Sequence, residues 1–385
     1  MTDIHRKSKN VRILVLGVNP FEDLPGYQLI GLLGKSNGNK LFAADDSEEA
    51  VAVLEQLHSQ IELVPHPSKG ATKYLDAVLQ ICDRHKIDFL IPANDAHLAA
   101  LLECSNHCKE IRALCPLLDW FPPGGLWNRW RIQNWLSQFC KTPARYPYET
   151  EADLLKWEHD HNYPVVVKGM RKGGLKALDH GEAVAARRNV WKNPANLGKY
   201  GGAYLEAFIE GTERATLLVF GWEGRLLCSL GIQKLATTQL GTTLVARIDE
   251  VFERDLDVKG LLSSFSGPGV VEVESRTDAQ GKEWFFEANL RFPTWIGALG
   301  KFGQWLVESF LDLVLGKEDV DQHAVRVPEP GTLIYRLPES GVLPMQETLG
   351  QLARVKHVKQ EESSTPASVG SLLWPSRSPH QFLTK

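Results

Sequence analysis

The first 118 residues alternate between short apolar runs and longer amphipathic stretches. The short apolar runs predict buried strands at 11–18, 41–45, 61–65, 87–93 and 111–116. The amphipathic stretches predict helices at 27–38, 47–60, 68–86 and 94–108. Ser47 is a favourable N-cap for the second of these helices. Strands that alternate with helices indicate a doubly wound parallel sheet, and therefore a Rossmann-like domain.

Ligands of doubly wound sheets bind at the carboxyl ends of the strands. This rule points to residues 19–26, after the first strand, and to Asn94, Asp95 and His97, after the fourth. Asp95 also suits the first turn of a helix, where an acidic side chain is stabilising. No clean G-x-G-x-x-G follows the first strand, so a dinucleotide site has little support.

The pattern changes after residue 118. Residues 119–127 are rich in proline, glycine and tryptophan and are expected to form a linker, and 128–141 form an amphipathic helix with tryptophans in the core. The β-branched strand 163–169 contains Lys168 near its end and leads into a glycine-rich, cationic loop. Backbone amides of such a loop can point at a phosphate, although a solvated hairpin turn is the alternative.

Short strands and turns dominate the next part of the chain. Turns at Glu210–Gly211 and Glu223–Gly224 divide residues 201–235 into three strands of an antiparallel sheet. A helix is expected at 301–317 and a late strand at 331–341. The tail from residue 363 is rich in serine and proline and is expected to pack loosely.

Residues 270–291 carry the strongest chemical signal. They predict two strands joined by a turn at 278–281. Strand side chains alternate between two faces, so Glu272 and Glu274 share one face, as do Glu287, Asn289 and Arg291. Clustered carboxylates repel each other unless something neutralises them, and their oxygens suit Mg²⁺. The alternative is an acidic hairpin that only contributes solubility.

The aromatic neighbours of this hairpin are Phe285, Phe286, Phe292, Trp295 and Phe302. Phe285 and Phe286 suggest a buried segment, in which carboxylates need partners. Phe292, Trp295 and Phe302 either line an apolar substrate pocket or belong to the core, and the core is favoured.

Composition narrows the class of protein. Of the 385 residues, 43% are hydrophobic and 23% charged, as in soluble globular proteins, and the net charge of −4 does not suggest a nucleic-acid surface. No apolar run approaches the ~20 residues of a membrane span. The polar N-terminus does not look like a secretion signal, and the spacing of the six cysteines shows no disulfide framework. We therefore expect a cytoplasmic protein that binds no nucleic acid and no membrane.

The order of these parts resembles the ATP-grasp superfamily, closest in layout to the carbamoyl phosphate synthetase large-subunit type and the related carboxylate–amine ligases. The resemblance covers about residues 11–315. Its most specific part is FFEANLR at 285–291 with the upstream glutamates, although Leu290 stands where the family usually has proline. It implies an α/β and α+β fold, with a Rossmann-like (pre-ATP-grasp) parallel sheet before a two-lobed ATP-grasp fold.

The resemblance also implies domain boundaries. These are a Rossmann-like domain at 1–118, a small lobe with the glycine-rich loop at 119–200, a large lobe with the metal site at 201–345, and a C-terminal extension at 346–385.

The resemblance carries over to nucleotide-binding residues. Arg129 and Lys168 match the cations near the nucleotide phosphates, and Gly173 and Gly174 match the mobile glycine lid. Glu206 matches the acidic residue of the adenine hinge, and Glu213, seven positions later, the one at the ribose hydroxyls. The backbone of Ala207, Phe208 and Ile209 would meet the adenine edge.

The catalytic and metal positions follow in the same way. Glu274, Glu287 and Asn289 match the magnesium ligands, although Glu272 faces the same way as Glu274. Arg291 matches the cation that meets the γ-phosphate or acyl phosphate, and Arg247 is a candidate for holding the substrate carboxylate. The expected cofactors are ATP and Mg²⁺, or Mn²⁺ in its place.

The resemblance implies an ADP-forming ligase. Such an enzyme activates a small carboxylate, such as an amino acid or peptide-like metabolite, as an acyl phosphate and joins it to an amine. Two alternatives stay open: carboxylation or carbamoylation through carboxyphosphate, and a nucleotide-binding module without catalysis. Family members are often dimers, which makes a homodimer an expectation.

Overall fold

The N-terminal part of the chain forms a parallel four-stranded sheet in the order β3-β2-β1-β4. Its strands are β1 (Arg12–Leu16), β2 (Lys40–Asp45), β3 (Ile61–Leu63) and β4 (Phe89–Pro92). The computed structural model describes residues 11–19, 25–34, 39–55, 60–67, 70–105, 108–121, 128–170, 173–193, 196, 202–238, 241–249, 255–316, 326–336 and 341–343.

Helices cover both faces of this sheet, so β1, an inner strand, is buried on both sides. Ile13 and Val15 pack in one apolar core, and Leu14 and Leu16 pack in another. The helices are α1 (Gly26–Leu33), α2 (Glu48–Glu55), α3 (Ala71–His85) and α4 (Asp95–Ser105). The hydroxyl of Ser47 accepts a hydrogen bond from the N–H of Ala50 at 3.1 Å, which confirms the predicted cap.

One predicted strand is wrong. Residues 109–114 form helix α5 (Lys109–Leu114), and α6 (Leu117–Trp120) follows it. Most side chains of α5 belong to residue types with high helix propensity, and only Ile111 is buried. A strand in the middle of a parallel sheet would bury a continuous run of side chains, which this segment does not have. The expected linker at 119–127 therefore begins inside α6, and 122–127 lie outside the described residues.

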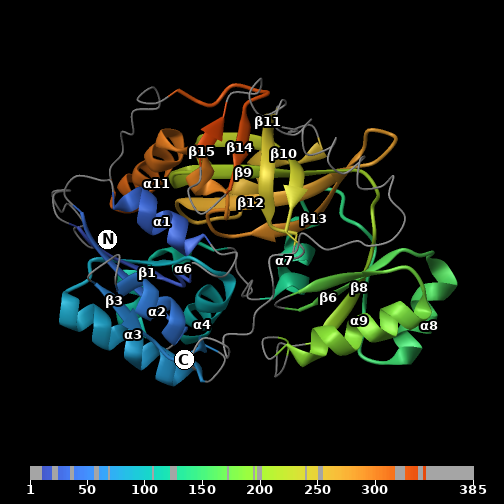
Figure 1. Cartoon of the computed structure of the whole chain (residues 1–385), viewed down its shortest axis with the longest axis horizontal. Helices are drawn as coiled ribbons and strands as arrows, with labels where there is room; N and C mark the ends of the chain where they lie inside the picture. The colour runs from blue at the N-terminus through green and yellow to red at the C-terminus, as the bar shows by residue number, and fades with distance from the viewer. Residues whose placement is uncertain are drawn as a thin grey trace, which may run out of the picture. The chain divides into compact units, whose positions relative to one another are not determined.

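The small lobe is a second four-stranded sheet in the order β5-β8-β6-β7, with antiparallel pairs. Its strands are β5 (Arg145–Pro147), β6 (Val165–Gly169), β7 (Gly174–Ala177) and β8 (Ala203–Ala207). Helices α8 (Glu151–Asp160) and α9 (His180–Lys192) lie beside this sheet (Figure 1) and bury Trp157 and Val190 against it. Helix α7 (Arg129–Leu136) precedes the sheet in sequence, and the side chain of Asn128 caps the N-terminus of this helix.

The large lobe is a seven-stranded antiparallel sheet in the order β13-β12-β9-β10-β11-β14-β15. Its strands are β9 (Thr212–Phe220), β10 (Leu226–Thr237), β11 (Thr243–Asp249), β12 (Gly269–Thr277), β13 (Glu283–Asn289), β14 (Leu333–Tyr335) and β15 (Gly341–Leu343). Helix α10 (Val258–Ser263) follows β11, and α11 (Lys301–Val314) follows the short helix η5 (Ile296–Leu299).

Both faces of this sheet contribute to an apolar core. Along β9, Leu217 belongs to one core and Leu218 to the other. The first core also holds residues from α1 and α11, which contact each other although far apart in sequence (Figure 1). Phe292, Trp295 and Phe302 are buried in this core, so the core interpretation of these aromatics is confirmed.

All of the described elements belong to one compact unit, residues 1–343. The proposed domain boundaries within it remain a prediction. The six cysteines lie among the described residues as free thiols. Among the described residues, no helix combines the length and apolarity that crossing a membrane requires.

Leu218 tests the contribution of β9, an inner strand of the seven-stranded sheet. Its side chain is fully buried. We expect Leu218→Ala to lower the free energy of unfolding by about 2–5 kcal/mol, because it removes apolar contacts and leaves a cavity. Urea unfolding followed by tryptophan fluorescence measures the change. Leu155→Ala, at a side chain that is 57% exposed, is the control and should have little effect.

Candidate active site

The predicted acidic hairpin is formed by β12 and β13, and its register decides which side chains meet. Glu272 pairs with Asn289, and Glu274 pairs with Glu287. The register then shifts, so that Ser275 pairs with Phe285 and Phe286 is the extra residue of a β-bulge. Directly paired residues point to the same face. The hairpin therefore gathers three carboxylates and one amide on one face, as the sequence predicted.

Glu272 is the deepest of these carboxylates, at 4% exposure. Its two oxygens accept hydrogen bonds from Asn289 Nδ2 at 3.1 Å and from Trp295 Nε1 at 2.7 Å. These neutral donors fix Glu272 in place. Glu274 instead lies opposite Glu287, which makes Glu274 the better partner for Glu287 in a shared cation site.

Glu274 is held by a cation that the sequence reasoning missed. Lys234, on β10, lies 2.5 Å from Glu274 Oε2 and 2.9 Å from Glu213 Oε1. Burial raises the pKa of Glu274 to about 7; Lys234 opposes this shift, whereas Glu272 adds to it. The signal was present in the sequence. Leu230, Ile232 and Lys234 alternate along β10, so the lysine follows two side chains of the apolar face.

Arg129 joins the small lobe to the hairpin. Its guanidinium lies 3.2 Å from Glu287 and donates to the carbonyl of Gly173 at 3.1 Å, while its backbone N–H donates to Met170 O. Burial alone would raise the pKa of Glu287, but the charges of Arg129 and Lys168, with others nearby, outweigh burial and lower it. The structure thus brings Arg129, Gly173 and Glu287 together. Residues 171 and 172 of the glycine-rich loop lie outside the described residues.

Lys168 forms a second link between the same parts. Its ammonium lies 2.7 Å from Glu206 and donates to the carbonyl of Phe286 at 3.0 Å. The amide of Gln133, on α7, also donates to this carbonyl. The bulged residue of β13 therefore accepts hydrogen bonds from two elements of the chain. Gly174 lies beside Lys168: a Cβ on Gly174 would come within 3.3 Å of Lys168 Cγ.

The predicted adenine hinge leads out of β8. The N–H groups of Ala207 and Phe208 already donate to Ala144 O and Pro164 O, so a nucleotide would have to use other groups of this segment. The carbonyl of Ile209 accepts a hydrogen bond from Arg276, which also lies 2.8 Å from Glu213.

The balance between burial and neighbouring cations differs at Glu206 and Glu213. Glu206 is 2% exposed, and burial raises its pKa, with Lys168 opposing. Burial would also raise the pKa of Glu213, but Lys234 and Arg276 outweigh burial and lower it.

Arg291 follows β13 and reaches the N-terminal sheet. Its Nε lies 3.1 Å from Asp95 Oδ1, at the start of α4, and its Nη2 lies 3.4 Å from Asn289 Oδ1. Asn94 caps α4 by accepting the N–H of His97 at 2.9 Å. Of the residues expected at the carboxyl ends of the parallel strands, Asp95 is thus tied directly to the predicted catalytic arginine.

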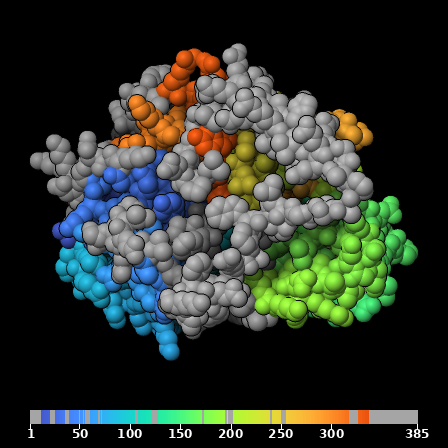
Figure 2. Space-filling view, in the orientation of Figure 1, coloured from blue at the N-terminus to red at the C-terminus, as the bar shows by residue number. Residues whose placement is uncertain are grey.

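Arg247 is not brought to this site. Arg247 pairs with Gln233 and donates a hydrogen bond to the side chain of Gln233. Lys234, the next residue on that strand, pairs with Ala246. Adjacent strand residues face opposite sides, so Arg247 lies on the face opposite Lys234 and Glu274. Its side chain is exposed, and the yellow segment that includes β10 and β11 reaches the surface in Figure 2. The expectation that Arg247 contacts the substrate is therefore corrected.

The donor set suits a divalent cation shared with phosphates. Among the described residues, no three His, Cys, Asp or Glu side chains converge closely enough to hold a metal ion alone. Glu274, Glu287 and Asn289 offer two carboxylates and an amide, the incomplete oxygen set with which Mg²⁺ is bound when phosphates complete its coordination. Burial and the charges of Glu272 and Glu287 raise the pKa of Glu274. A cation bound nearby would stabilise the charged form of this carboxylate and would offset the repulsion from Glu272 and Glu287. The residues present therefore fit Mg²⁺.

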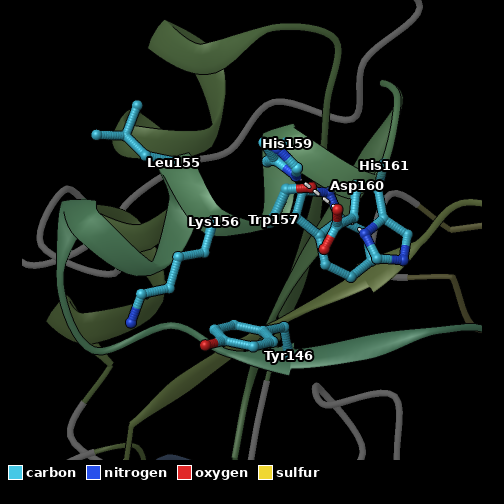
Figure 3. Close-up of a pocket in the computed structure, with 7 residues that line it drawn as sticks. All are labelled: Tyr146, Leu155, Lys156, Trp157, His159, Asp160 and His161. Atoms are coloured by element: carbon cyan, nitrogen blue, oxygen red, sulfur yellow. Dashed lines mark hydrogen bonds and ion pairs between the residues drawn. The ribbon is translucent and has the colours of Figure 1, made fainter.

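A surface depression of about 500 Å³ lies elsewhere, between β5 and α8 (Figure 3). Its lining includes Tyr146 and Trp157, and the indole of Trp157 stacks on the imidazole of His161 with centroids 3.9 Å apart. It contains none of the predicted site residues. The carboxylates and cations of the hairpin are therefore the better candidate for the active site.

Two comparisons with known proteins found similarity to this chain. Residues 27–115 match the family described as the PylC-like, N-terminal domain. A search of curated protein sequences found no match. Solved structures resemble the chain over most of its length. One is carboxyaminoimidazole ribonucleotide synthase from Aspergillus clavatus complexed with ATP, with TM-score 0.60, 15% identity, and coverage of 85% of this chain and 81% of that one.

Two further structures extend the comparison. The L-amino acid ligase from Bacillus licheniformis has TM-score 0.58 and 16% identity, and the match covers 85% of this chain and 79% of that one. The biotin carboxylase domain of Hydrogenobacter thermophilus 2-oxoglutarate carboxylase, in complex with MgADP and bicarbonate, has TM-score 0.58 and 14% identity over 86% and 75% of the two chains. The chain has the ATP-grasp fold. The N-terminal parallel sheet and the two antiparallel lobes that follow confirm the predicted fold class.

The pair Lys168–Glu206 can be tested without substrates. Both side chains are buried, so we expect Lys168→Met to lower the free energy of unfolding by about 3–5 kcal/mol, because it strands a buried carboxylate. The double variant Lys168→Met/Glu206→Leu should recover much of this loss. Urea unfolding of the two variants measures the difference, and a double variant no more stable than the single one would contradict the pairing.

Proposed function

We propose that this ATP-grasp protein is an ADP-forming carboxylate–amine ligase. One observation carries the proposal: Glu287, on the hairpin, is joined by Arg129, beside the glycine-rich loop, while Glu274 lies directly across the strand pair. The residues that we propose as divalent-cation ligands and as phosphate-binding cations therefore lie close together, which supports one shared site. Phosphoryl transfer needs this combination, because its catalysis depends on positioning and charge neutralisation.

Each residue then has a role. Glu274, Glu287 and Asn289 would hold Mg²⁺, and Arg129 and Lys168 would neutralise the nucleotide phosphates. Gly173 and Gly174 would bring backbone amides close to those phosphates. The segment Glu206 to Ile209 would line the adenine, and Glu213 would accept hydrogen bonds from the ribose hydroxyls.

Bound Mg²⁺–ATP would supply the phosphoryl group that converts a carboxylate into an acyl phosphate, with release of ADP. The amine nitrogen then attacks the acyl carbon, the bond to phosphate oxygen breaks, and the nitrogen loses a proton to give the amide. Arg291, already aligned by Asp95, would stabilise the negative charge on the transferred phosphoryl group. No nucleophilic side chain is required.

The class of acid is the open part of the proposal. The L-amino acid ligase is similar in fold, which supports amino acids or peptide-like metabolites as the first acids to test. The carboxylase domain is described with bicarbonate, which supports carboxyphosphate chemistry as the second candidate. That domain is also described as a dimer, and we propose a cytoplasmic homodimer for this chain.

Glu287→Gln tests the proposal. Phosphate release from Mg²⁺-ATP is first screened with pools of amino acids and amines, and with bicarbonate alone. Turnover that needs both an acid and an amine supports ligation, whereas turnover with bicarbonate alone supports the second candidate. The substitution should then lower kcat by about 10²–10³-fold, the cost of one electrostatic contact to the reacting group.

Glu223→Gln is the matched control, because Glu223 is exposed at the turn between β9 and β10. Glu223→Gln should leave turnover unchanged. EDTA should abolish the activity of the wild-type protein and of this control variant. Full activity of a folded Glu287→Gln variant would refute the metal assignment. Nucleotide binding without any acid-dependent ADP release would favour a non-catalytic module.

A further inference from the structure

Lys234 is the buried cation that the proposed chemistry has not yet used. Its side chain is 2% exposed, and its ammonium contacts Glu274 at 2.5 Å and Glu213 at 2.9 Å. A third contact, to the carbonyl of Gly241, measures 3.5 Å. Two carboxylates thus flank the ammonium of Lys234 within the site.

The position of Lys234 conflicts with a metal ion bound alone. A magnesium ion lies about 2.0–2.1 Å from each ligand oxygen. Glu274 Oε2 already has the ammonium at 2.5 Å, so a metal on Glu274 would sit close to a buried positive charge. Charges interact strongly where water is excluded. The ammonium therefore opposes a free cation at this carboxylate.

An entering polyphosphate removes this conflict. Its negative charges would lie between the metal and the ammonium and attract both. The remaining partner of Lys234, Glu213, would keep the ammonium near the site after Glu274 had turned to the metal. The metal and the nucleotide would then each raise the affinity for the other, as linkage requires.

We propose that Lys234 is an internal counter-ion that couples divalent-cation binding to nucleotide binding. The proposal rests on the ligase function proposed above. In the free protein Lys234 neutralises Glu274, which stabilises this partly buried carboxylate while no metal is bound. The same contact keeps the site from taking up a cation before the nucleotide arrives. Lys234 is in this respect a positioning residue for Glu274.

Mn²⁺ binding to the full chain tests the proposal without turnover. Free Mn²⁺ is measured by EPR in titrations with and without a non-hydrolysable ATP analogue, and the Mn²⁺ that the analogue binds in protein-free solution is subtracted. Wild-type protein should bind Mn²⁺ at least about 10-fold more tightly with the analogue, or about 1.4 kcal/mol. Lys234→Met should bind Mn²⁺ alone at least about 10-fold more tightly than wild type, because Glu274 has lost its counter-ion. The gain from the analogue should then shrink.

The controls locate the effect. Lys156→Met removes a lysine from the exposed surface of α8 and should leave Mn²⁺ affinity unchanged. Adding Glu274→Gln to Lys234→Met should abolish the tight binding of Mn²⁺ alone. Lys234→Gln replaces Lys234→Met if the latter does not fold. If neither folds, equal Mn²⁺ affinity of wild type with and without the analogue still overturns the coupling.

The outcomes separate this proposal from the ligase function. Wild-type protein that turns over ATP, together with a Lys234→Met variant whose affinity for Mn²⁺ alone is unchanged, would overturn only the coupling. In that case Lys234 would be a structural ion-pair partner. Wild-type protein that binds neither Mn²⁺ nor the analogue would overturn both proposals.

Discussion

The crowding of three carboxylates, one buried and two partly buried, on one face of an antiparallel strand pair is the constraint on which the site depends. A carboxylate removed from water needs hydrogen-bond donors or cations close by. Glu272 finds Trp295, Glu274 finds Lys234 and Glu287 finds Arg129. These three partners come from different parts of the chain. Satisfying these carboxylates therefore connects the hairpin to the segment before η5, to strand β10 and to helix α7.

Polar contacts connect the small lobe to the hairpin. Arg129, at the start of α7, and Lys168, near the end of β6, both contact β13. Arg129 contacts the carboxylate of Glu287 and the carbonyl of Gly173. Lys168 contacts the carbonyl of Phe286 and the carboxylate of Glu206. The same side chains thus connect the phosphate-binding loop to the predicted metal ligands.

Much of this arrangement could be predicted because strand alternation is a local property. The facing of Glu274 and Glu287 follows from two strands and one short turn, and the structure has that pairing. The parallel sheet followed equally from alternating apolar runs and helices. Residues 111–114 were misassigned to a strand because a short apolar run does not distinguish a strand from part of a helix.

The misplaced residue was Arg247, and the missed one was Lys234. The face that a side chain on β11 occupies relative to β12 depends on the pairing of two intervening strands, β10 and β9, and the sequence does not give that register. The contact of Lys234 with Glu274 likewise joins residues 40 positions apart. Alternation along β10 indicates that Lys234 points to the apolar face, but only the sheet order shows which acids meet it there.

At the bulge in β13, the carbonyl oxygen of Phe286 accepts hydrogen bonds from side chains of β6 and α7. Because the acceptor of Lys168 and Gln133 is the carbonyl of Phe286, any amino acid at position 286 presents the same atom. Alanine scanning along the strand would therefore report only on the phenyl ring and would overlook this connection. Replacing the following amide by an ester, which makes the carbonyl oxygen a poorer acceptor, is the kind of backbone chemistry that reaches it.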